Sequence, residues 1–176
     1  LMDYVVIAGL VRSPMGVFQS LYEPGAKKRW SMPKEEDIIG CKIAAIDPFF
    51  LEETQATAEL CVKYNKSYVT IDSKHDSYLH QHCAVNVVSK ECTESDGYKD
   101  KSIEEIYELL VASTDGLVII TSGGNDMIYG RKGQLMKRMK PFSVDVKSTL
   151  GAGDTFKAGC VYGLLHGMED DELVRF

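Results

Sequence analysis

The chain has 176 residues, of which 44% are hydrophobic, and its 20 lysines and arginines against 26 aspartates and glutamates give a formal net charge of −6. This length and apolar content are sufficient for a globular domain with a sizeable core. The acidic balance argues against a nucleic-acid partner, which requires a broad surface of clustered Lys and Arg. One basic cluster lies between Arg131 and Lys140, and we interpret it as the solvated surface of a predicted hairpin.

Cysteine usage and hydropathy indicate where the protein resides. The five cysteines have no paired CxxC spacing, and their odd number and scattered positions favour a reducing compartment. No apolar run approaches the ~18 residues of a membrane span. The run Tyr4–Val11 is too short for the core of a signal peptide and follows Asp3. We therefore expect a soluble, cytoplasmic protein without a membrane partner.

The N-terminal part is predicted to contain two short strands and an irregular segment. Residues 3–11 form an apolar run, and residues 17–22 alternate between apolar and polar side chains. Residues 23–26 contain a Pro-Gly turn, and the charged residues 27–37 are expected to be irregular.

From residue 41 onward, predicted strands and helices alternate. The strands are Cys41–Asp47, Ser67–Asp72, Ala84–Ser89 and Leu117–Thr121, and the helices are Leu51–Tyr64 and Ser102–Ala112, the second starting with a capping box of Ser102 and Glu105. Residues Met127–Gly130 and Gln134–Met139 are expected to pair as a hairpin. This order is typical of a three-layer α/β domain with a largely parallel sheet.

Polar residues follow several of these predicted strands. In open α/β sheets, ligands bind at the carboxyl ends of the strands. The residues at or just past such ends are Asp47, Asp72, Lys90 and Thr121. We expect them to lie along one edge of the sheet.

The segment Ser148–Phe156, with the core Gly-Ala-Gly-Asp, is the most informative in the chain. It starts an apolar helix that we expect to run to about His166, with Gly167 favouring its end. The first four N–H groups of a helix lack intrahelical partners, and the helix dipole is positive there. Small residues let an anion approach these donors, and Asp154 in the same turn can accept a proton. An anion site beside a base is what phosphoryl transfer to an alcohol requires.

Simpler interpretations exist for the same residues. Gly151–Gly153 would also permit close packing of a helix on a strand, because short glycine motifs recur by chance. Asp154 would also suit a helix N-terminus without a catalytic role. A metal site is an alternative for a further group, His75, His80, His82 and Cys83. These residues lack the paired spacing of zinc ligands, so we interpret them as part of a polar helix or loop.

Residues 148–160 resemble the second signature of the ribokinase-like (PfkB) carbohydrate kinase family. The matching positions are Thr149, Gly151, Ala152, Gly153, Asp154, Thr155, Phe156, Ala158 and Gly159. The segment Val118–Gly123 is similar to the Thr-x-Gly nucleotide segment of the family. The resemblance implies a three-layer α/β/α fold with a mostly parallel, Rossmann-like sheet and a small β lid at the N-terminal end. We therefore divide the chain into lid-like strands at 1–37 and a partial nucleotide-binding and catalytic domain at 38–176.

The resemblance also implies roles for individual residues. Asp154 would be the general base that takes the proton from the acceptor hydroxyl, and the N–H groups of Gly151–Gly153 would form the anion hole for the γ-phosphate. The contacts to the nucleotide would come from Thr121, Gly123, Lys90 and Thr149. Mg²⁺ would bridge the phosphates of ATP, held mostly by phosphate oxygens and water and not by a protein metal site.

The leading hypothesis is an ATP-dependent kinase that phosphorylates a hydroxyl of a sugar or nucleoside. The resemblance also implies that the lid strands can form the surface of a homodimer. The sequence departs from the family pattern at two places. Ser148 stands where the family usually has Asp, which leaves a monovalent-cation site uncertain, and Lys90 and Thr93 stand where Asn-x-x-Glu is expected.

The ends of the chain also bear on the hypothesis. The N-terminal Gly-Gly-x-x-x-Asn region and the C-terminal segment that closes over adenine do not occur between Leu1 and Phe176. We therefore expect an internal fragment or a truncated member of the family. A non-catalytic nucleotide-binding relative and an inactive fragment of a kinase are the alternatives.

Overall fold

A seven-stranded sheet organises the molecule, with its strands in sequence order from β1 to β7. The structure is a computed structural model that describes residues 4–6 and 32–176. Neighbours from β1 to β5 are parallel, whereas β6 pairs antiparallel with both β5 and β7. The bounds are β1 (Tyr4–Val6), β2 (Ile43–Ile46), β3 (Ser67–Ile71), β4 (Val85–Val88), β5 (Leu117–Ile120), β6 (Met127–Gly130) and β7 (Lys137–Met139).

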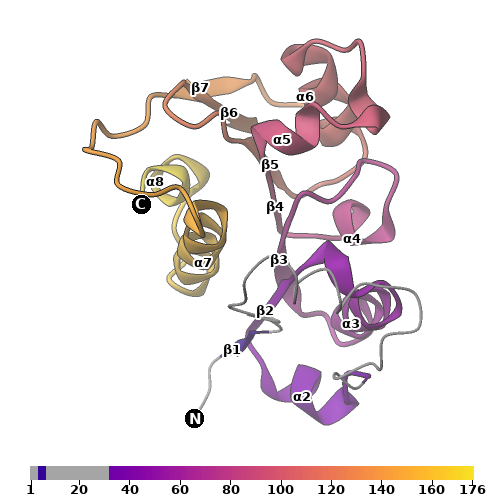
Figure 1. The fold of residues 1–176 in the computed structure, drawn as a ribbon. Coiled ribbons are helices and arrows are strands. Elements are labelled where there is room, and N and C mark those ends of the chain that lie inside the picture. The colour runs from indigo at the N-terminus through magenta and orange to yellow at the C-terminus, as the bar shows by residue number, and fades with distance from the viewer. Residues whose placement is uncertain (1–3, 7–31) are drawn as a thin grey trace, which may run out of the picture.

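Helices lie on both faces of this sheet, which confirms the predicted three-layer fold (Figure 1). One face carries α7 (Ala152–Leu165) and α8 (Asp170–Arg175). The other face carries α2 (Glu35–Gly40), α3 (Glu52–Lys63), α4 (Tyr78–Gln81), α5 (Lys90–Thr93) and α6 (Ile103–Ala112). Two 3₁₀ turns, η1 (Pro48–Phe50) and η2 (Asp96–Tyr98), lie in the connections.

The sheet forms the centre of the core because apolar side chains pack against both of its faces. Every residue of β2, β4 and β5 is buried, as expected for parallel strands with helices on both sides. On one face, Cys160 and Val161 of α7 join a cluster with Val69 of β3. On the opposite face, a second cluster includes Tyr68, and a third includes Leu110 of α6.

The start of α6 and the end of α7 lie where the sequence predicts them, because short-range motifs determine both. The capping box of α6 is present, because the Glu105 N–H donates to Ser102 Oγ at 3.2 Å and the Ser102 N–H donates to Glu105 Oε2 at 2.7 Å. Gly167 follows the end of α7 with a φ of 66°, a left-handed conformation that favours glycine.

Several short elements differ from the expectation. Residues 35–40 form α2 inside a segment expected to be irregular. Its first turn is Glu35–Asp37, and these acidic residues stabilise a helix start although they give no apolar periodicity. Residues 4–6 form β1, which pairs in parallel with β2 and thus joins the main sheet. The rest of the predicted lid strands, within 1–3 and 7–31, lies outside the described residues.

Two general properties were also predicted from composition. The five cysteines are all free thiols. Among the residues that the structure describes, no helix is long and apolar enough to cross a membrane.

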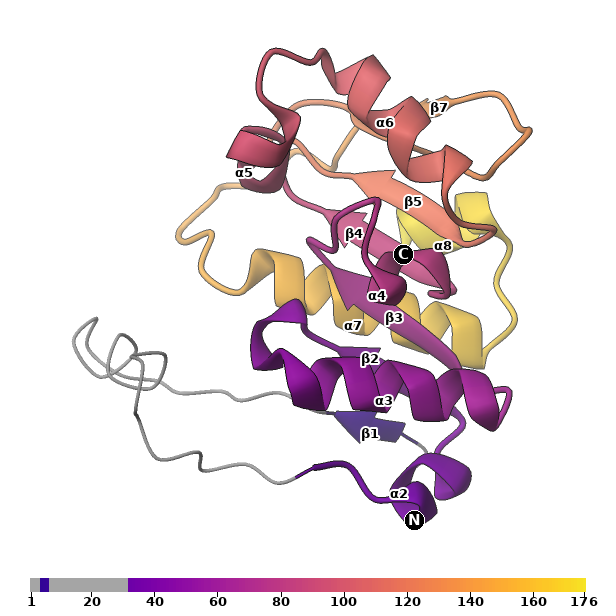
Figure 2. The same cartoon turned by 90° about the vertical axis from the view of Figure 1, so that its right-hand side faces the viewer.

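The fold brings the carboxyl ends of β2 to β5 to one edge, because these strands are parallel. Figure 2 shows that α3 and α7 lie on opposite sides of β2 and β3. The start of α7 lies above the end of β3, where a Cβ added to Gly153 would be 3.1 Å from Ile71 Cδ1. Residues that follow the strands therefore share an edge with the first turn of α7.

Candidate active site

The first turn of α7 begins at Gly151, which has a φ of 78°. This left-handed conformation is one that glycine adopts without the strain a Cβ would introduce. The Gly151 carbonyl oxygen accepts hydrogen bonds from the Thr155 N–H and from Thr155 Oγ1, each at 2.9 Å. The turn is thereby closed by Thr155, one residue after the predicted base.

Several backbone donors of this turn remain available. Within residues 4–6 and 32–176, no acceptor is found for the N–H groups of Gly151, Gly153 or Asp154. Ala152 differs, because its N–H donates to the Thr149 carbonyl oxygen at 3.1 Å. Ala152, Gly153 and Asp154 are exposed. The helix is 14 residues long, so its N-terminus carries the full positive end of the dipole. The turn can therefore bind an anion through amides that include that of Asp154.

Glycine has a different role at each end of this motif. At Gly153 a side chain would press on Ile71, so a small residue permits the close packing that was one of the simpler interpretations. At Gly151 nothing lies within 4 Å of an added Cβ. Glycine is favoured there because the backbone has a positive φ. Packing and anion access are thus compatible in the same turn.

The carboxylate of Asp154 is accessible to solvent. Its side chain is 65% exposed, and its Oδ1 lies 3.7 Å from Lys157 Nζ in the next turn of the helix. It is positioned beside the free amides, where it can accept a proton from a molecule bound at the helix start.

Hydrogen bonds join the carboxyl ends of β3, β4 and β5. The Ser89 N–H donates to Asp72 Oδ1 at 2.6 Å, and the Thr121 N–H donates to the Val88 carbonyl oxygen at 2.9 Å. Asp72 has a φ of 49°, which is uncommon for a residue with a side chain. Asp72 thus links the loop after β3 to the loop after β4.

The four predicted nucleotide contacts lie at or near this edge. Thr121 is half-buried directly after β5, and Gly123 follows with a φ of 58° and open space around it. Lys90 is the exposed first residue of α5 and lies 3.4 Å from Glu94 in an ion pair. Thr149 is exposed and precedes α7. Thr93 is buried, and its hydroxyl donates to the Lys90 carbonyl oxygen at 2.6 Å.

Lys157 and Asp47 form an ion pair that the sequence analysis did not predict. Lys157 Nζ is 2.5 Å from Asp47 Oδ1, with the two side chains 8% and 13% exposed. The loop that carries Asp47 is held by Thr54, whose Oγ1 donates to the Asp47 carbonyl oxygen at 2.6 Å and accepts from the Phe50 N–H at 3.2 Å. A lysine in an otherwise apolar helix, three residues after Asp154, was the signal available in the sequence.

His80 belongs to the interior, whereas His75 is half-buried and His82 is exposed. His80 Nε2 donates to the Leu110 carbonyl oxygen at 2.9 Å, and its Nδ1 accepts from Asn86 Nδ2 at 2.8 Å. Burial lowers the pKa of His80. Across the described part of the chain, no three His, Cys, Asp or Glu side chains gather so as to hold a metal ion.

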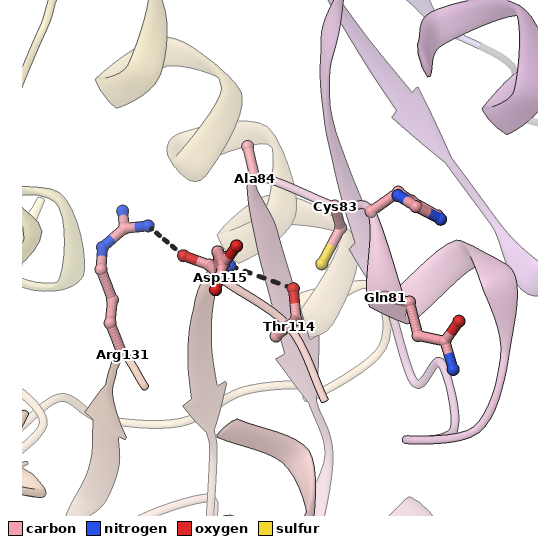
Figure 3. A pocket seen from close by; sticks show the side chains of 8 residues that line it. Gln81, Cys83, Ala84, Thr114, Asp115 and Arg131 are labelled. Carbon is pink, nitrogen blue, oxygen red and sulfur yellow. Dashed lines mark hydrogen bonds between the residues drawn. The ribbon is translucent and has the colours of Figure 1, made fainter. Parts of the chain in front are cut away.

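A pocket is found at the opposite edge of the sheet, where residues precede β4 and β5 (Figure 3). Two of its polar side chains have partners: Thr114 Oγ1 accepts from the Gly116 N–H at 3.0 Å, and Arg131 Nη1 donates to the Asp115 carbonyl oxygen at 3.1 Å. This pocket contains none of the predicted site residues.

Solved structures with similar folds are sugar and nucleoside kinases. Adenosine kinase from Schistosoma mansoni in complex with 2-fluoroadenosine is 14% identical with a TM-score of 0.66, covering 80% of this chain and 49% of that protein. Ribokinase from Arabidopsis thaliana complexed with ribose and ATP is 15% identical with a TM-score of 0.66, covering 80% and 48%. A ribokinase II-type protein from E. coli in complex with ATP and Mg²⁺ is 11% identical with a TM-score of 0.66, covering 80% and 51%.

The chain spans about half the length of each of these proteins, and at these identities the likeness shows the fold alone. No match was found among curated proteins. The family model described as pfkB family carbohydrate kinase matches residues 47–176. The fold is thus that of the sugar and nucleoside kinases. The chain belongs to the pfkB family of carbohydrate kinases.

Proposed function

We propose that this chain carries the phosphate-donor site and the general base of an ATP-dependent kinase. The observation that carries the proposal is the first turn of α7, where unengaged amides and the exposed carboxylate of Asp154 lie side by side. This turn shares an edge with the ends of β3, β4 and β5. Family membership and the kinase fold support the same function.

In the proposed mechanism, Asp154 accepts the proton of the acceptor hydroxyl as that oxygen attacks the γ-phosphorus of ATP in line, and the bond from the γ-phosphorus to the bridging oxygen breaks to release ADP. The amides of Gly151, Gly153 and Asp154 stabilise the charge on the phosphoryl oxygens. The Ala152 N–H would join them after leaving the Thr149 carbonyl oxygen, to which it donates at 3.1 Å. The helix dipole adds a favourable field at the same place.

The nucleotide would extend from this turn toward Thr121, Gly123, Lys90 and Thr149. Thr121 is half-buried after β5 and Gly123 lies in the exposed bend that follows it. Lys90 can move its ammonium to phosphate because its pair with Glu94 is on the surface. Mg²⁺ would be held mainly by phosphate oxygens and water, as this ion prefers, and would neutralise charge on the phosphates. The residue at the usual monovalent-cation position is Ser148, whose Oγ accepts from the Leu150 N–H at 3.2 Å.

The acceptor class that we propose is a sugar or nucleoside. The similar proteins bind 2-fluoroadenosine or ribose, which are molecules of these classes. A cytoplasmic location and a homodimer formed through the lid strands complete the proposal.

A non-catalytic, nucleotide-binding relative is the second candidate. It is favoured by Ser148 and by the pair Lys90 and Thr93, which replace residues expected in the family. Calorimetry with ATP and Mg²⁺, followed by a phosphate-transfer assay over a panel of sugars and nucleosides, separates the two candidates. The kinase proposal expects binding and transfer to at least one acceptor. Binding without transfer to any acceptor, in the protein at its natural length, would favour the second candidate.

A further inference from the structure

Lys157 is the most buried charged partner of any ion pair between described residues. Its side chain is 8% exposed and that of Asp47 is 13% exposed, whereas the Arg131–Asp170 pair is 30% and 23% exposed. Desolvation of an ammonium is unfavourable unless it is well paired. The contact of 2.5 Å with Asp47 provides that pairing and fixes the position of Nζ.

The fixed ammonium also faces the proposed base. Lys157 Nζ lies 3.7 Å from Asp154 Oδ1, so a single cation lies between two carboxylates. One carboxylate belongs to the loop after β2 and the other to the first turn of α7. Asp47 is itself held by the Thr54 hydroxyl, which bonds to its backbone. The cation is therefore anchored to the sheet and not only to the helix that carries the base.

The order of the strands determines on which side of Asp154 the Lys157–Asp47 pair lies. The start of α7 lies above the end of β3, as the contact between Gly153 and Ile71 shows. The proposed nucleotide contacts follow β4 and β5, and Asp47 follows β2 on the other side of β3. In-line transfer places the attacking hydroxyl opposite the leaving nucleotide. The Lys157–Asp47 pair is thus on the side of Asp154 from which the acceptor would approach.

We propose that Lys157 is a positioning residue for this reaction, holding the carboxylate of Asp154 in place on the acceptor side while Asp47 holds the ammonium. This role rests on the proposed kinase function. It requires no contact between Lys157 and the nucleotide. A misplacement of about 1 Å in a reacting group costs about 100-fold in rate. Loss of the ammonium is therefore expected to lower kcat and to leave nucleotide binding almost unchanged.

The test compares variants of the protein at its natural length. Lys157→Met alone leaves the Asp47 carboxylate, which is 13% exposed, without its partner, and is expected to destabilise the fold. The informative variant is therefore the double replacement Asp47→Asn with Lys157→Met, which removes both charges together. Lys157→Arg keeps a cation at this position, and Lys63→Met is a matched control because Lys63 of α3 pairs with Glu35 of α2 on the exposed surface.

The measurements are kcat, KM for ATP and ATP affinity by calorimetry. We expect the double variant to lose about 10- to 100-fold in kcat with ATP affinity within about twofold of the parent. Lys157→Arg should retain most of the parental kcat, and Lys63→Met should match the parent. Parental kcat in a folded double variant would show that the pair is only structural. Loss of ATP binding and kcat together would also overturn the positioning role.

Asp154→Asn, measured in parallel, distinguishes this inference from the proposed function. If Asp154→Asn abolishes phosphate transfer and the double variant retains parental kcat, the result supports the kinase mechanism and refutes the positioning role of Lys157. If the parent transfers no phosphate, both fall.

Discussion

The buried contacts of His80 lead to a prediction about stability. The His80 ring has no exposed surface, and its two nitrogens join Leu110 of α6 to Asn86 of β4. Asn86 Nδ2 also donates to the Ser73 carbonyl oxygen at 2.8 Å. His80→Phe keeps a flat aromatic ring, slightly larger than imidazole, and removes both nitrogens, so it tests the polar contacts.

The expected cost follows from what each partner retains. The Leu110 carbonyl oxygen still accepts hydrogen bonds from the Ser113 N–H at 3.1 Å and from the Ser113 hydroxyl at 2.9 Å, so losing the His80 donor costs little free energy there. Asn86 Nδ2 keeps Ser73 but loses the acceptor for its second N–H. One buried donor without a partner costs about 1–3 kcal/mol. We therefore expect His80→Phe to lower the free energy of unfolding by about 2 kcal/mol at pH 8.

The pH dependence has a definite sign. Burial lowers the pKa of His80 in the folded state, whereas the unfolded chain has a value of about 6.5. The unfolded state thus binds the proton more readily, and the contribution of His80 is complete above pH 6.5 and decreases as the pH falls toward the folded pKa. The difference in unfolding free energy between the parent and His80→Phe should become smaller at pH 5.5 than at pH 8.

Urea denaturation at the two pH values measures both effects, with an unchanged m-value as the sign that the variant unfolds in the same way. His82→Phe is the matched control, because His82 is exposed and its replacement should change stability by less than about 0.5 kcal/mol. An equal destabilisation by His80→Phe at pH 8 and pH 5.5 would refute the reasoning about protonation. A destabilisation no larger than that of His82→Phe would refute the role of the polar contacts.

Three further predictions concern packing, pairing and capping. Lys157→Met should destabilise the fold by about 3–5 kcal/mol in urea titrations, and adding Asp47→Asn should recover part of this; no recovery would contradict a charge-pairing origin. Gly116→Ala should cost about 3 kcal/mol by thermal unfolding, because its Cβ would lie 2.3 Å from the Cys83 carbonyl oxygen, and a parental Tm would contradict this contact. Ser102→Ala should cost about 1 kcal/mol through the lost helix cap, and an unchanged midpoint in urea would contradict that contribution.

The layers of the fold could be predicted because each strand and helix is indicated by a pattern within a few consecutive residues. The strands β2 to β5 are short apolar runs of the kind that parallel sheets bury, and α6 carries its capping box in consecutive residues. The start of α7 was predicted from a glycine motif whose conformational need is visible at Gly151. The short helix α2 was missed because only Ile38 is buried in it, so no apolar periodicity exists to detect.

The candidate site was predicted less completely than the fold. The carboxylate of Asp154 and the amides beside it follow from one motif, but the engagement of the Ala152 N–H by Thr149 depends on the loop geometry before α7. The pair of Lys157 and Asp47 joins residues 110 positions apart. Such a contact becomes visible only when the sheet order places β2 beside the helix.

The central claim is that the first turn of α7 binds phosphate and supplies the base for its transfer. The most direct measurement is phosphate transfer from ATP by the parent and by Asp154→Asn, with ATP affinity measured on the same samples. Removing a general base is expected to lower kcat by about 10²- to 10⁴-fold, because no side chain then accepts the proton of the acceptor hydroxyl. We predict this loss with ATP affinity retained and with an unchanged unfolding midpoint, since Asp154 is an exposed side chain. Parental turnover in Asp154→Asn would contradict the account.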